Sequence, residues 1–80
     1  MDLSKILGRN IRHFREELGA SQEEIAFRAG MNRAYLSDVE RGERNPTVQV
    51  VGRLAKALGV SPAELFRDLS ERPGKRSQGA

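Results

Sequence analysis

The chain has 80 residues, no cysteine, one histidine and a formal net charge of +3. One small domain fits this length, and the lack of cysteine excludes disulfides and thiolate zinc sites. Because no signal-peptide pattern and no apolar run of about 18 residues is present, we expect a cytoplasmic protein without membrane contact. A single histidine also excludes a cluster of imidazole ligands, and we expect no metal or cofactor. Much of the positive charge falls in residues 70–80. We expect this segment to be a disordered basic tail behind a nearly neutral domain, 1–69.

The first two predicted helices follow from an apolar stripe and a capping pattern. The first helix ends at Gly19, and its stripe consists of Leu7, Ile11, Phe14 and Leu18. Ser21 and Glu24 have the spacing of a capping box, which predicts the start of a second helix. This second helix ends at Gly30.

A third predicted helix, at about 32–41, has two different faces. Asn32 is a suitable N-cap, and Gly42 follows the helix as a stop. Tyr35, Leu36 and Val39 form the apolar side. Within an arc of roughly 140° on the opposite side lie the polar or small residues Arg33, Ala34, Ser37, Asp38 and Arg41.

Two further helices complete an all-α prediction. The fourth begins at Pro46–Thr47 and ends at Gly59. Its residues expected to face inward are Val48, Val51, Leu54, Ala55 and Leu58. Ser61, Pro62 and Glu64 predict a short fifth helix with a second capping box. Since no strand pattern appears and the connections are short, the sequence predicts a compact five-helix domain.

The second and third helices have the features of a helix-turn-helix. Both are short, a tight glycine turn joins them, and the small Ala26 lies where steeply crossing helices approach closely. The segments SQEEIAFRAGMNRAYLSDVERGERNP and LAKALGVSPAELF resemble the phage Cro/repressor-type (XRE-like) DNA-binding domain. The resemblance covers roughly residues 5–69, and the length is similar to that of restriction–modification controller proteins and small phage repressors.

The resemblance implies a lambda-repressor-like domain that regulates transcription in a bacterium or phage, at the nucleoid. Such a protein binds double-stranded DNA as a homodimer, with the third helix of each copy in the major groove of a near-palindromic operator. The residues expected to read bases are Arg33, Ala34, Ser37 and Asp38. Those expected to contact phosphates are Gln22, Asn32, Tyr35, Arg41, Arg44 and Asn45.

The resemblance also implies two structural roles. Arg15 and Glu40 are similar to an ion pair that joins the first helix to the end of the third. The region of the fourth and fifth helices often pairs subunits in such proteins, so we expect a dimer interface of Val60, Leu65, Phe66 and Leu69. For these four residues, closing the core of their own chain is the alternative.

The residues themselves suggest chemistry for the predicted reading face. Arg33 has two parallel donors that match guanine O6 and N7, and Ala34 offers a methyl group to thymine. Asp38 can accept from cytosine N4, can pair with Arg41 one turn later, or can discourage nonspecific DNA by repelling phosphates.

Two other classes of function are weighed against DNA binding. A protein-interaction module with the same fold is favoured by the near-neutral domain and by Asp38, but not by the arginines at 33, 41 and 44. An enzyme is disfavoured because the chain has one histidine, no cysteine and no phosphate-cradling glycine loop.

Overall fold

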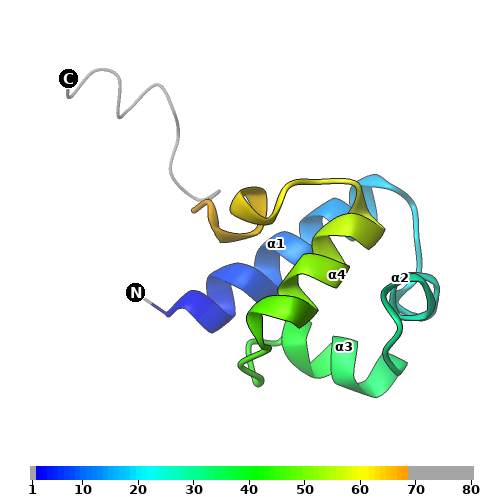
Figure 1. The fold of residues 1–80 in the computed structure, drawn as a ribbon, viewed down its shortest axis with the longest axis horizontal. Helices are drawn as coiled ribbons and strands as arrows, with labels where there is room; N and C mark the ends of the chain where they lie inside the picture. Colours follow the sequence, from blue (N-terminus) through cyan, green and yellow to red (C-terminus); the bar gives the residue numbers. More distant parts are fainter. Residues whose placement is uncertain (1, 69–80) are drawn as a thin grey trace.

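A computed structural model describes residues 2–68 of the chain. Its elements are α1 (Leu3–Glu17), α2 (Gln22–Ala29), α3 (Arg33–Glu40), α4 (Val48–Leu58) and the 3-10 helix η1 (Pro62–Phe66) (Figure 1). This part of the chain has no strand, so the all-helical class is confirmed. Within it, no helix has the length and apolar character needed to cross a membrane. The predicted tail 70–80 and Leu69 lie outside the described residues.

The helices surround a single core. α1 packs against α3, α4 and η1, while α2 packs against α3 and α4 (Figure 1). Each of the five elements contributes a side chain with no solvent exposure, and these are Ile11, Ile25, Leu36, Leu54 and Leu65. Burying one such side chain contributes about 1.5–3 kcal/mol. The core therefore fixes the position of every element, including the short α2 and α3.

The predicted capping box of α2 is confirmed. The backbone N–H of Glu24 donates to the Ser21 hydroxyl at 3.0 Å, and the Glu24 carboxylate accepts from the Ser21 backbone N–H at 2.9 Å. The bond to the Ser21 backbone lowers the pKa of Glu24. At the other end, Gly30 has a φ of 75°, a left-handed conformation that glycine adopts without strain.

The prediction of a fifth α-helix with its own capping box is wrong. η1 is a single five-residue 3-10 helix, and Ser61 makes no side-chain capping bond. The buried amide of Asn10 donates to the backbone carbonyls of Glu64, Leu65 and Arg67 at 3.4, 2.9 and 2.6 Å. These bonds join the end of η1 and the residue after it to α1, and the Glu64 carbonyl also accepts from the backbone N–H of Arg67. Sequence reasoning missed Asn10 altogether.

Three apolar residues lie elsewhere than predicted. Val48 was expected to face inward, but it is 88% exposed because it is the first residue of α4 and extends past the core. Leu18 follows the last turn of α1 and is 53% exposed. Leu65 is fully buried in the core of its own chain, so its assignment to a dimer interface is wrong.

Candidate nucleic-acid interface

α3 is anchored by one side only. Leu36 and Val39 are completely buried, whereas Arg33 and Ala34 are exposed. At the start of the helix, the side-chain oxygen of Asn32 accepts a hydrogen bond from the backbone N–H of Tyr35 at 2.8 Å. The core contacts and this cap hold α3 with its polar face turned outward.

A buried ion pair fixes the end of α3. The Arg15 guanidinium donates from Nε and Nη2 to the two carboxylate oxygens of Glu40, at 2.7 and 3.0 Å. Only 4% of the Glu40 side chain and 13% of the Arg15 side chain are exposed. Hydrogen bonding to Glu40 raises the pKa of Arg15 above its ordinary value. A further Arg15 donor reaches the Ala20 carbonyl at 3.0 Å. The structure thus brings the predicted pair together between α1 and α3.

Gly8 is a positioning residue that sequence reasoning missed. A Cβ atom at this position would lie 2.3 Å from the Val39 carbonyl oxygen and 2.6 Å from that of Glu40. α1 therefore meets the backbone of α3 directly, which is possible only without a side chain. The sequence indication was a glycine in the interior of a helix, where it lowers helix stability unless close packing requires it.

The outward face of α3 begins with a free arginine. Arg33 is exposed and forms no ion pair or side-chain hydrogen bond with any residue between 2 and 68. Ala34 beside it is exposed as well. All the donors of the Arg33 guanidinium are therefore available to a ligand.

One turn later, the same face carries a cluster of charges. The Asp38 carboxylate pairs with Arg41 and, at 3.4 Å, with Arg44. Arg41 also donates to the Ser37 hydroxyl at 2.6 Å and contacts Glu43 at 3.3 Å. The structure therefore contains the Asp38–Arg41 pair that was the alternative to cytosine recognition. Since the pair is half open to solvent, it contributes little net stability.

The Arg44 guanidinium also lies over an aromatic ring. Its central carbon is 5.5 Å from the centre of the Tyr35 ring, a cation–π distance. Tyr35 itself is half-buried and packs against the core. Arg44 is thus held beside α3 by both Tyr35 and Asp38, although it follows the helix in the sequence.

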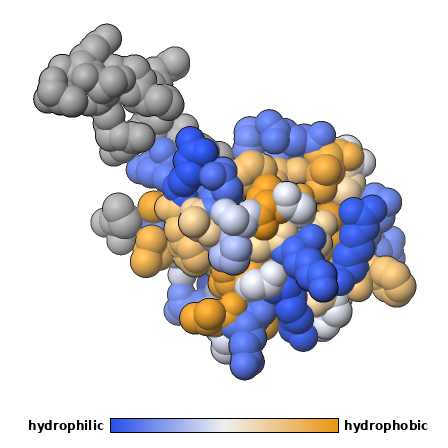
Figure 2. Space-filling model, turned by 45° about the horizontal axis from the view of Figure 1, so that its top comes forward, coloured by the Kyte–Doolittle hydropathy of each residue, from blue (hydrophilic) through white to orange (hydrophobic). Residues whose placement is uncertain are grey.

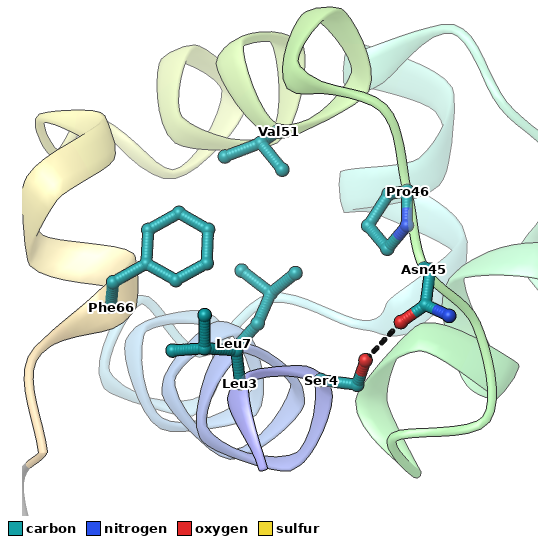
Figure 3. Close-up of a pocket in the computed structure, with 7 residues that line it drawn as sticks. All are labelled: Leu3, Ser4, Leu7, Asn45, Pro46, Val51 and Phe66. Atoms are coloured by element: carbon teal, nitrogen blue, oxygen red, sulfur yellow. Dashed lines mark hydrogen bonds between the residues drawn. The ribbon is translucent and has the colours of Figure 1, made fainter. Parts of the chain in front are cut away.

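The predicted phosphate contacts lie at several edges of this face. Gln22 is the first residue of α2, and its side-chain nitrogen donates to Glu40 at 3.0 Å. One N–H of that amide therefore remains for another acceptor. Asn45 follows α3, and its side-chain oxygen accepts from the Ser4 hydroxyl (Figure 3). Its amide nitrogen makes no hydrogen bond within the described chain.

A second surface of the molecule is apolar. A hollow of about 130 Å³ lies between the start of α1, α4 and η1 (Figure 3). A second hollow of about 270 Å³ adjoins it between α4 and η1 and shares Pro46, Val51 and Phe66 with it. Figure 2 shows that hydrophobic patches lie among hydrophilic side chains on one face of the molecule. We call this surface the apolar groove and define it by the lining residues Leu3, Pro46, Val48, Val51, Gly52 and Phe66.

The apolar groove includes one of the four residues predicted for a dimer interface. Phe66 lines it and is 38% exposed. Val60 is half-buried and packs against the core. Gly52 also lines the apolar groove. A Cβ atom at this position would meet no atom of the chain within 4 Å. Close packing within the chain therefore does not explain this glycine.

Comparison with known proteins identifies similar regulators. A family described as helix-turn-helix matches residues 11–65. An uncharacterized HTH-type transcriptional regulator, y4dJ of Sinorhizobium fredii, is 48% identical over 73 residues, which cover 91% of this chain and 95% of that protein. The control protein C.SmaI of Serratia marcescens is 42% identical over 66 residues, covering 82% of this chain and 79% of its own length.

Solved structures show the same fold. The restriction–modification controller protein C.AhdI from Aeromonas hydrophila superposes with a TM-score of 0.76 and 41% identity, over 79% of this chain and 96% of that one. The hypothetical transcription factor NHTF from Neisseria superposes with a TM-score of 0.79 and 37% identity, over 99% of this chain and 86% of its own.

Proposed function

The chain belongs to the helix-turn-helix family of the XRE type, and we propose that it is a sequence-specific DNA-binding regulator of transcription. One observation carries this proposal. α3 is held from inside by buried contacts and by the Arg15–Glu40 ion pair, while its outward face presents a free arginine. A rigidly held helix with such a face is suited to the major groove.

We assign the base contacts to the first turn of α3. The free Arg33 guanidinium can bind guanine O6 and N7 with two parallel hydrogen bonds, and the Ala34 methyl group can contact thymine. Ser37 and Asp38 lie one turn further along the same face. Because Asp38 already pairs with two arginines, we assign it the role of holding Arg41 and Arg44 at the edge of the DNA major groove.

Phosphate contacts surround this reading face in the proposed complex. Gln22 and Asn32 lie at the N-terminal ends of α2 and α3, where free N–H groups and the helix dipole favour anions. We assign further phosphate contacts to Tyr35 on α3 and to Arg44 and Asn45, which follow α3. Arg41 and Arg44 are held by carboxylates through exposed contacts, which phosphates can replace at small cost in free energy.

The same protein is proposed to act as a homodimer through the apolar groove. Val48 and Phe66 are exposed apolar side chains beside a hollow that a second copy would fill. Gly52 has no side chain, so a partner helix can approach α4 closely at this point. No residue that lines the two hollows lies on the outward face of α3, although Asn45, one of the predicted phosphate contacts, lines the smaller hollow. A two-fold interface here therefore leaves both reading faces free.

The function is tested by selecting binding sites from a random duplex library. We expect a near-palindromic sequence with half-sites about one helical turn, roughly 34 Å, apart. A parallel titration with random-sequence DNA at two salt concentrations measures the nonspecific contribution. Failure to enrich any sequence, together with no salt-dependent binding, would rule out DNA recognition and favour a protein-interaction module.

Arg33→Ala is expected to weaken binding to the selected site by about 1–3 kcal/mol per half-site and to relax selectivity at one base pair. The reason is the loss of a bidentate contact to guanine. Repeating the selection with the variant checks this prediction. Arg12→Ala is a matched control because Arg12 is an exposed arginine on α1. An equal loss of affinity on all sequences would instead make Arg33 a phosphate contact.

Val48→Glu is expected to convert the dimer to monomers, because each copy would bury an unpaired carboxylate in the apolar interface. Sedimentation equilibrium measures the change. The fold should persist, since Val48 is 88% exposed within one chain. Phe27→Glu is the control, because Phe27 is 85% exposed on α2 and away from the groove. A dimer that survives Val48→Glu would place the interface on another surface.

A further inference from the structure

A basic groove lies between α2 and α4, separate from the outward face of α3. Arg28, Arg53 and Lys56 line it, together with Ala29 and Ala57. Its volume is about 570 Å³, which falls within the roughly 300–1,000 Å³ of many small-ligand sites. No acidic side chain lines this groove. Three cations from two helices therefore converge on one hollow whose floor is formed by small apolar side chains.

The three cations have no acidic partner of their own. None of them forms an ion pair within 4.0 Å inside residues 2–68. Glu24, one turn before Arg28 on α2, attracts it only at longer range. By contrast, most arginines elsewhere in this part of the chain are paired, including Arg12, Arg15, Arg41, Arg44 and Arg67. The groove therefore gathers three cations without an ion-pair partner in one hollow, whereas Arg33, the other such arginine described above, lies on the outward face of α3.

Helix stability explains only part of this arrangement. Lys56 lies in the last turn of α4, where a cation interacts favourably with the helix dipole. Arg53 precedes it by three residues, and like charges at that spacing destabilise a helix. The exposed Arg53 has no partner that offsets this repulsion. An external anion would offset it.

We propose that the groove of Arg28, Arg53 and Lys56 binds phosphate groups. Arginine guanidinium groups match phosphate oxygens in pairs, and the lysine ammonium adds a third positive charge. Three cations suit a ligand with several adjacent phosphates better than a single small anion. Such phosphates belong either to a free polyphosphate compound or to DNA that extends past the contacts of α3. The site stands independently of the proposed reading face, because the two share no residue.

The test is a titration of the full chain with inorganic triphosphate as the probe. Heteronuclear NMR measures the chemical-shift changes of the protein during the titration. We expect saturable shifts at the end of α2 and in α4 that sodium chloride of equal ionic strength does not produce. The double variant Arg53→Gln/Lys56→Gln should bind at least about tenfold more weakly, because two charge-assisted contacts are removed. The double variant Arg9→Gln/Arg12→Gln on α1 loses the same charge and should bind normally.

A second arm measures binding to a long random-sequence duplex as a function of salt. If the phosphates are those of DNA, Arg53→Gln/Lys56→Gln should reduce the log–log salt slope by about 0.9 for each lost phosphate contact. If they belong to a free compound, this slope should equal that of the α1 control while triphosphate binding is lost. Equal behaviour of the two double variants in both arms would overturn the site. It would leave recognition of the selected operator by α3 unaffected.

Discussion

Glu40→Ala is expected to lower the free energy of unfolding by about 3 kcal/mol or more, near the values observed when one partner of a buried ion pair is removed. The variant leaves the Arg15 guanidinium buried without its bidentate partner and removes the acceptor of Gln22. Chemical denaturation measures the change. Glu16→Ala is the matched control, because its pair with Arg12 is exposed and is expected to contribute only about 0.3–0.5 kcal/mol.

The same pair allows stability to be separated from orientation of the reading helix. The double variant Arg15→Met/Glu40→Leu removes both charges, and such replacements are often neutral or stabilising. We expect it to regain most of the stability that Glu40→Ala loses. If the ion pair orients α3, the double variant should still bind the selected operator more weakly. Wild-type affinity in this variant would show that packing alone orients the helix.

Gly8→Ala is expected to destabilise the fold by about 1–3 kcal/mol, a typical cost of overpacking, in spite of the higher helix propensity of alanine. The added Cβ would meet two backbone carbonyl oxygens of α3, which cannot rotate away as a side chain does. α1 and α3 must therefore move apart. The melting temperature and the operator affinity should both fall, because this contact supports the end of the reading helix.

Gly52→Ala is the control substitution for Gly8→Ala, and the two are compared by their effect on the free energy of unfolding. Both glycines lie inside helices, but an added Cβ at position 52 meets no atom of the chain within 4 Å. In the Val48→Glu background, where dimer contacts are removed, Gly52→Ala should stabilise the fold by up to about 1 kcal/mol. Destabilisation of equal size at both positions would show that close approach to α3 is not what Gly8 provides.

Local patterns in the sequence were sufficient for most helix boundaries. The capping box of Ser21 and Glu24 and the left-handed glycine at position 30 depend on neighbouring residues alone. The apolar spacing of Leu36 and Val39 likewise predicted which side of α3 is buried. Because these features act over one or two turns, a single sequence contains the information that determines them.

The predictions that failed depend on contacts between distant segments. The predicted fifth α-helix is a 3-10 helix, and Asn10, more than 50 residues earlier, donates to backbone carbonyls at and just after its end. Leu65 is buried and Val48 is exposed because the arrangement of α1, α4 and η1 decides where the core ends. Helical periodicity predicts the side of a helix on which a residue lies. It does not predict whether another element covers that residue near the end of the helix.

The sequence by itself therefore determined an all-helical domain with a polar face on its third helix, together with the family to which the chain belongs. Only the tertiary structure decided that Gly8 meets the backbone of α3, that Asp38 pairs with Arg41 and Arg44, and which surfaces remain open. The physical reason is the distance along the chain between the residues that interact. Caps and apolar stripes result from interactions between near neighbours in the chain, whereas grooves and the closest backbone approaches result from how whole helices pack together.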